Sequence, residues 1–224
     1  MKRSEINNII QGAKDFFEER KFFLPPWAFW KPQDWKGKYE SCSEIIDNKL
    51  GWDITDFGTD DFHKFGLILF TIRNGNIDNN RKNYCEKIMI VEEDQITPMH
   101  FHWSKTEDII NRGGGNLVLE LFLADKDQQL TGETFNIKTD GYTRNMEPGD
   151  KVILTPGESI SFEPYFAHRF YGEKGKGKVL VGEVSSVNDD KADNCFVDGV
   201  GRFPTIIEDE PPIHLLVSDY PNYL

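Results

Sequence analysis

A series of short β-like segments, each bounded by turn-forming residues, constrains the fold of this 224-residue chain more than any other feature. Gly, Pro, Asn or Asp bounds each of these segments, which are 67–72, 87–91, 116–122, 151–154, 159–162 and 178–184. Many short strands at close spacing are typical of a sandwich or barrel. The sequence therefore predicts a mainly β fold from Gly66 onward.

The region before these strands predicts helices and an aromatic arm. Apolar residues at helical spacing predict a helix over 4–20 with Ser4 as its N-cap, and a second helix is expected over about 41–50, ended by Gly51. The prolines and aromatic residues of 24–32 exclude both a regular helix and a central strand there. That segment is therefore expected to lie as an arm against other parts of the protein.

No repeat, low-complexity tract or long linker marks a second domain. We therefore expect a single domain over 1–224. Within it, 1–65 is the N-terminal helical and aromatic arm, 66–187 is the barrel core and 188–224 is an ordered, wrapping C-terminal segment.

Charge and cysteine content narrow the classes of partner and compartment. With 26 Lys and Arg against 38 Asp and Glu, the formal net charge of −12 argues against binding to nucleic acid or an anionic membrane surface. No apolar run approaches the roughly 18 residues of a membrane-spanning helix. Cys42, Cys85 and Cys195 match neither a zinc motif nor a disulfide framework, which favours a cytoplasmic protein with reduced thiols.

The segment 97–107 carries the strongest chemical signal. Residues two apart on a strand point to the same side, so His100 and His102 are expected to project together, and a short bend returns Glu107 to them. His168 lies in a second strand-like segment about sixty residues later. Three imidazoles and one carboxylate are a suitable ligand set for a divalent metal ion.

Three further residues are candidates for acid–base or ligand-binding roles near the metal. Lys105 lies between the expected metal ligands, where a divalent ion and burial would lower its pKa, although an exposed lysine on a turn has the same pattern. Glu183 and Glu120 each interrupt an apolar run, so each faces either water or a polar barrel interior.

Several polar and aromatic residues outside these motifs remain weaker candidates. Lys87 is on the strand before the histidine pair, and polar loops supply candidate binding residues for a polar small molecule: Asp189, Asp190, Arg202 and Glu208. Trp27 and Trp30 either cap the pocket or belong to a dimer-interface arm. The glycines at 113–115 lack the context of a phosphate loop and indicate a tight turn with positive φ.

The two histidine segments resemble the two motifs of the cupins. His100, His102, Glu107 and Gly114 follow the spacing of the first motif, and Gly149, Pro156-Gly157 and His168 resemble the second, with extra residues between Gly157 and His168. The longer strings TPMHFHWSKTEDIINRGGG and LPPWAFW are similar to the D-lyxose isomerase family along nearly the whole chain.

This resemblance implies a cupin, jelly-roll-like β-barrel with N-terminal helices and a manganese-preferring, homodimeric ketol-isomerase. Its substrates would be free monosaccharides, D-lyxose with D-xylulose and also D-mannose with D-fructose. Lys105 and Glu183 would be catalytic. Trp30, Glu120, Asp190, Arg202 and Glu208 would bind substrate, and His100, His102, Glu107 and His168 would hold the metal.

Other activities are compatible with the same motifs. A cupin dioxygenase uses a similar ligand set with ferrous iron, and a non-catalytic sugar-binding cupin would keep the fold with a vestigial metal. A phosphosugar isomerase would require a cationic phosphate clamp, but Lys and Arg are not clustered near the motif apart from Lys105 and Arg112.

Overall fold

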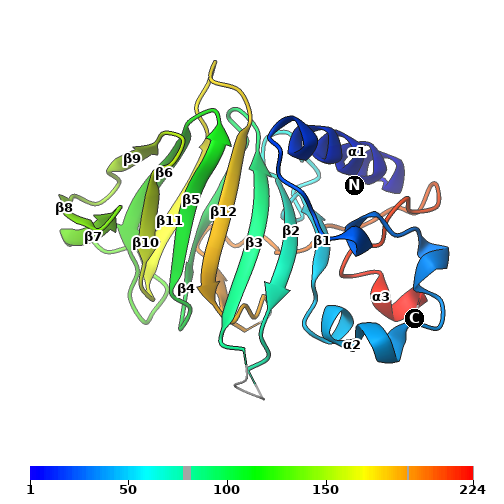
Figure 1. Ribbon diagram of the computed structural model, residues 1–224. Coiled ribbons are helices and arrows are strands. Elements are labelled where there is room, and N and C mark those ends of the chain that lie inside the picture. The colour runs from blue at the N-terminus through cyan, green and yellow to red at the C-terminus, as the bar shows by residue number, and fades with distance from the viewer. Residues whose placement is uncertain (78–81, 191, 224) are drawn as a thin grey trace.

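The computed structural model describes residues 1–77, 82–190 and 192–223, and two antiparallel sheets form its centre (Figure 1). The larger sheet contains, from edge to edge, β1 (Gly51–Thr55), β2 (Leu67–Asn74), β3 (Tyr84–Val91), β12 (Val179–Ser186), β5 (Glu107–Gly114), β10 (Ser159–Phe162), β7 (Phe135–Thr139) and β8 (Tyr142–Met146). The smaller sheet contains β13 (Asn194–Phe196), β4 (Thr97–His102), β11 (Phe166–Gly172), β6 (Leu117–Leu123) and β9 (Lys151–Leu154). The prediction of a mainly β, cupin-type barrel with N-terminal helices is confirmed.

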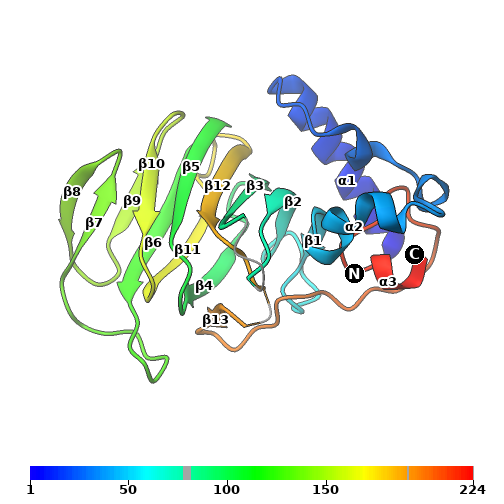
Figure 2. The same ribbon diagram turned by 60° about the horizontal axis from the view of Figure 1, so that its bottom comes forward.

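The helical segments gather beside β1, at one end of the larger sheet, and both chain ends lie there as well (Figures 1 and 2). They are α1 (Arg3–Glu19), the 3-10 turns η1 (Pro26–Phe29) and η2 (Pro32–Trp35), α2 (Tyr39–Asp47) and the short α3 (Tyr220–Tyr223). Within the described part of the chain, no helix is both long and apolar enough to cross a membrane.

Two apolar cores follow from the alternation of side chains along the strands. Inward residues of both sheets, such as Leu69, Val181 and Leu119, fill the space between them. Ile68, Ile88 and their neighbours on the opposite face of the larger sheet pack against α1. The runs of β2, β3 and β12 are therefore apolar on both faces and not simply alternating.

The C-terminal segment fastens the start of α1. The buried Arg3 guanidinium donates to Glu208 at 2.6 Å and to Asp219 at 2.8 Å. Ser4 is not the predicted N-cap, because Lys2 holds that position and Ser4 is already inside the helix. Instead, the Ser4 N–H and hydroxyl both donate to the Asp209 carboxylate, at 2.9 and 2.7 Å. A residue distant in the sequence therefore accepts hydrogen bonds from the first turn of the helix.

Several elements differ from the sequence prediction. The second helix is shorter than expected, and Gly51 opens β1 instead of ending that helix. Strands β7, β8 and β13 were not predicted; four of the five residues of β8 are exposed, so it has no apolar alternation to detect. The larger sheet begins with β1, inside the segment interpreted as the N-terminal arm, and β13 pairs with β4 from within the predicted tail.

The glycines at 113–115 have a role different from a tight turn. Gly113 and Gly114 do have positive φ, 141° and 89°, but they lie at the end of β5, where its pairing with β12 shifts register. A Cβ on Gly114 would lie 2.2 Å from the Lys178 carbonyl oxygen. These glycines therefore permit a bulge with close backbone approach.

Candidate metal centre and active-site cavity

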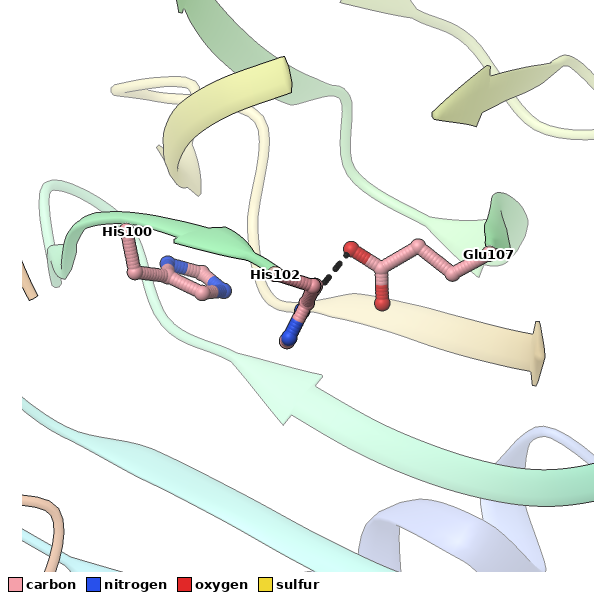
Figure 3. Close-up of side chains that lie close together, drawn as sticks. All are labelled: His100, His102 and Glu107. Atoms are coloured by element: carbon pink, nitrogen blue, oxygen red, sulfur yellow. Dashed lines mark ion pairs between the residues drawn. The ribbon is translucent and has the colours of Figure 1, made fainter. Parts of the chain in front are cut away.

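The predicted metal ligands lie together inside the barrel, on strands of both sheets. His100 and His102 are on β4, which is buried along its whole length, Glu107 opens β5, and His168 is on β11, directly opposite His100. Figure 3 shows His102 and Glu107 facing each other across the gap between β4 and β5, with His100 beside them. Candidate ligand atoms of His100, His102 and Glu107 all lie within 4.8 Å of one another.

One carboxylate oxygen is the meeting point of this cluster. Glu107 Oε1 is 3.3 Å from His102 Nε2 and 3.3 Å from His168 Nε2. All three atoms are buried, and none has a hydrogen-bond partner. The His100 and His168 rings are 4.3 Å apart between centroids. Buried polar atoms that converge without hydrogen bonds are costly, and a cation among them would satisfy all of them.

Backbone contacts orient two of the imidazoles toward the same point. His100 Nδ1 lies 2.8 Å from the Pro98 carbonyl oxygen, and His168 Nδ1 lies 3.2 Å from that of Phe166. When each Nδ1–H donates to its carbonyl, each Nε2 keeps its lone pair for a metal. The four residues therefore fit a divalent ion with nitrogen and oxygen ligands.

Burial keeps two of the imidazoles, those of His100 and His168, in the neutral form that binds metals. Burial, and then the neighbouring His168 and His102, hold the pKa of His100 well below its usual value. Burial is also the main cause that lowers the pKa of His168 to about 4. Burial raises the pKa of Glu107, but Lys105 and His102 outweigh it and hold that pKa well below 4.5. All of these states favour binding of a cation.

A buried network of four charges lies beside the ligands. Lys105 Nζ donates to Glu107 Oε2 at 2.8 Å and to Glu183 Oε1 at 2.9 Å. Lys87 Nζ lies 3.2 Å from the same Glu183 oxygen and donates to Asn188 Oδ1 at 2.7 Å. Glu183 thus faces the barrel interior, and it is within reach of both lysines.

The charge state of Lys105 differs from the sequence expectation. Burial does lower its pKa, but the Glu107 and Glu183 carboxylates have the larger combined effect and raise it above the ordinary value of 10.5. Burial raises the pKa of Glu183, whereas Lys105 and Lys87 together lower it below 4.5. In the structure as it stands, both lysines therefore have ionised carboxylate partners.

The ligands and the charge network border one cavity, whose volume is about 460 Å³ including its opening to solvent. Asp190 and Arg202 also line this cavity, as the sequence predicted for substrate-binding residues. Arg202 Nη2 donates to Asp53 at 2.7 Å, and its Nε donates to Asp190 at 3.4 Å.

Three of the predicted substrate-binding residues lie elsewhere. Glu120 is on the outer face of β6, where it accepts from Arg169 Nη2 at 2.8 Å. Glu208 is more than half exposed and pairs with Arg3 at the start of α1. Trp30 packs edge-on against Trp35, with ring centroids 5.0 Å apart, in a separate aromatic cluster. None of the three lines the cavity described here.

Sequence reasoning missed two buried aspartates that position the site. Asp193 accepts from the Ser104 N–H at 2.8 Å and from the Lys105 N–H at 3.0 Å, which fixes the turn carrying Lys105. Asp53 on β1 holds Arg202. Both contacts join positions more than 80 residues apart, so no local spacing in the sequence indicates them.

The fold and this cluster define a cupin-type protein whose barrel has a site suited to a metal ion. The sequence model of the D-lyxose isomerase family matches residues 1–220. The chain is 47% identical over 227 aligned positions to the D-lyxose/D-mannose isomerase of Serratia proteamaculans and 46% identical to that of Escherichia coli O157:H7, covering all of each chain. It therefore belongs to the D-lyxose isomerase family and is an isomerase.

Solved structures extend the likeness of fold beyond these relatives. The L-ribose isomerase of Cellulomonas parahominis with L-ribose superposes with a TM-score of 0.61 at 15% identity, over 92% of this chain and 98% of that one. The L-ribose isomerase of Geodermatophilus obscurus gives a TM-score of 0.58 over the same shares of the two chains. At these identities the likeness concerns the fold alone.

Proposed function

We propose that this isomerase interconverts D-lyxose and D-xylulose, and also D-mannose and D-fructose, with a divalent metal ion and by proton transfer. The observation that carries the proposal is the convergence of His102 and His168 on Glu107 Oε1. The other oxygen of Glu107 accepts from Lys105 at 2.8 Å, and Lys105 also donates to Glu183. The names of the full-length relatives support both the pentose and the hexose as substrates.

The residues that would hold the metal are His100, His102, Glu107 and His168. A divalent cation there supplies Lewis acidity, which polarises the C1 and C2 oxygens of an open-chain sugar and acidifies the adjacent C–H. Manganese is our proposal for that cation, based on the family resemblance, because nitrogen and oxygen ligands also suit Fe, Co, Ni and Zn.

The chain's own residues supply the proton transfers. In the direction from aldose to ketose, the ionised Glu183 carboxylate takes the proton from C2 to form a cis-enediol, exchanges that proton with solvent, and then gives a proton to C1. The Lys105 ammonium, held 2.9 Å from Glu183, gives a proton to O1 and recovers one from O2. Two adjacent groups with opposite protonation states are suited to such a paired exchange.

The remaining polar residues of the cavity orient the substrate. Lys87, Asp190 and Arg202 offer charged donors and acceptors to the hydroxyls of the sugar chain. The carboxylates of Asp53, Asp190 and Glu183 offset the cationic side chains that line the cavity, so among the described residues no free cationic cluster is available to bind a phosphate. A neutral free monosaccharide therefore fits this cavity better than a phosphorylated sugar.

The assembly and compartment are further parts of the proposal. We expect a homodimer, as the family resemblance implies, and sedimentation of the purified protein tests it. A cytoplasmic location agrees with three cysteines that are free and buried in the structure.

A panel of free aldoses and ketoses tests the proposed activity. Metal-depleted protein is assayed with and without added manganese, under anaerobic conditions, and products are identified by NMR. We expect D-lyxose to give D-xylulose only when the metal is present. This turnover should not require oxygen. Turnover that requires oxygen would instead indicate a dioxygenase, and no turnover of any sugar would leave a non-catalytic sugar-binding protein.

A further inference from the structure

The cavity is divided into a polar and an apolar side. The polar side contains the lysines and carboxylates described above, whereas the apolar side is lined by Phe57, Leu67, Leu69, Met89, Ile109, Phe170 and Phe196. Thr97 is the one hydroxyl-bearing residue among the described lining residues. It pairs with Phe170 across the sheet, and the adjacent Ile96 carbonyl accepts from the Gly66 N–H, next to Leu67. Thr97 is therefore placed on the apolar side.

A β-bulge explains why Thr97 faces the cavity. Along a regular strand, residues three apart point to opposite sides, so Thr97 and His100 should diverge. The partners of Thr97 and His100 are Phe170 and His168. Three steps along β4 therefore match only two steps along β11, so β4 contains one extra residue. Such an extra residue re-aims side chains and is frequent beside active sites. The bulge brings the Thr97 side chain to the same cavity as the metal ligands.

Among the described residues, the Thr97 hydroxyl has no hydrogen-bond partner. Thr97 is 3% exposed, and its Oγ1 atom is buried without a hydrogen bond. A hydroxyl held in this state destabilises the folded protein, because it has lost its hydrogen bonds to water and gained none. Valine has nearly the same shape and would avoid this cost. The hydroxyl is thus a polar group in the apolar wall of the cavity, and its capacity for hydrogen bonding is unused.

We propose that the Thr97 hydroxyl determines sugar specificity, by hydrogen bonding to one substrate hydroxyl on the carbon chain beyond C2. This inference rests on the proposed function, since it assumes that O1 and O2 lie at the metal centre. A site with a buried group that requires a substrate hydroxyl rejects analogues that lack it, because the protein group is then left unpaired. The hydroxyl therefore selects for one configuration of the sugar chain.

The test compares Thr97→Val with Thr97→Ser in manganese-loaded protein. D-lyxose and its analogues without the 3-, 4- or 5-hydroxyl are measured for kcat/KM and, by calorimetry, for binding. We expect Thr97→Val to lose about 10- to 100-fold in both for D-lyxose. Thr97→Ser keeps the hydroxyl and should stay within about threefold of the unmodified protein. Metal content should be unchanged in both variants.

The analogues identify the substrate hydroxyl and separate this role from a structural one. For one analogue, the Thr97→Val variant and the unmodified protein should have equal kcat/KM and equal affinity. That analogue lacks the sugar hydroxyl to which the Thr97 hydroxyl binds. The melting temperature of Thr97→Val should rise by about 2–4 °C, because an unpaired buried hydroxyl has been removed. If the Thr97 hydroxyl instead stabilised the fold, its removal would lower the melting temperature.

Each contrary result has a distinct meaning. The inference would be overturned if Thr97→Val and the unmodified protein bound and turned over D-lyxose equally. It would also be overturned if Thr97→Val lost the same factor in kcat/KM for D-lyxose and for every analogue, or if its loss of kcat/KM followed a loss of metal. If the unmodified protein binds these sugars through Thr97 but isomerises none, the proposed reaction fails and the inference stands. Absence of both binding and turnover overturns both.

Discussion

Replacement of Glu183 by glutamine removes one charge from the buried network while keeping the shape of the side chain. Two lysines, Lys105 and Lys87, are balanced there by two carboxylates, Glu107 and Glu183. In the variant, two ammonium groups face one carboxylate, so one buried positive charge is left uncompensated. The amide oxygen of glutamine still accepts a hydrogen bond from Lys105, but it no longer takes a proton from carbon.

The two consequences of Glu183→Gln have different magnitudes and assays. Loss of a positioned acid–base group lowers kcat by about 10²–10⁴-fold, which is about 3–5 kcal/mol in activation free energy. Removing one partner of a buried ion pair costs about 3–5 kcal/mol of folding free energy. Isomerisation of D-lyxose and urea unfolding measure these effects, and metal analysis should show an unchanged content because Glu183 is not a ligand.

A matched control uses the other carboxylate that interrupts an apolar strand. Glu120→Gln changes a side chain on the outer face of the barrel, paired with Arg169 and Lys151. It should keep the turnover of the unmodified protein and lose at most about 1 kcal/mol of stability. The reasoning is refuted if Glu183→Gln turns over within threefold of the unmodified protein, or if the two variants lose activity equally.

Other perturbations separate metal binding, proton transfer and stability. His102→Ala should lose metal and turnover together, whereas Lys105→Ala should keep the metal, by elemental analysis, and lose at least about 100-fold in kcat; normal turnover by Lys105→Ala would disprove its role. Because the pKa of His168 lies near 4 in the fold and near 6.5 when unfolded, the unfolded state binds the extra proton between these values. The metal-free protein should therefore be stable above pH 6.5 and lose about 3 kcal/mol as the pH falls to 4, as followed by urea unfolding; a flat profile would contradict this. Arg3→Met leaves Asp219 buried and unpaired, and should cost about 3–5 kcal/mol of stability with unchanged kcat per folded molecule; a melting temperature equal to that of the unmodified protein would show that this ion pair contributes nothing.

The parts of the site that the sequence predicts are those set by local spacing. His100 and His102 are two apart on one strand, so strand geometry alone points them to the same side, whereas Glu107 joins them from the other sheet after the turn that Asp193 holds. Glu183 and Glu120 have the same local pattern, yet they face opposite sides of the barrel. Which side each faces depends on the pairing of β12 with β3 and of β6 with β11, and these contacts cross long stretches of chain.

Features set by distant contacts could not be read from the sequence. Asp193 and Asp53 look like ordinary polar residues until the fold brings them to Lys105 and Arg202. Thr97 reaches the cavity only through a bulge, which breaks the alternation that a sequence pattern assumes. The pair of carboxylates that raises the pKa of Lys105, against the lowering effect of burial, is likewise assembled by the fold.

The central claim is a metal-dependent proton transfer on a free sugar, and one measurement tests it most directly. Metal-depleted protein is incubated with D-lyxose in deuterium oxide, with and without manganese, and the product is analysed by NMR. The account predicts D-xylulose only in the sample with manganese, carrying solvent deuterium at C1. Equal product without the metal, or product with no deuterium at C1, would contradict it.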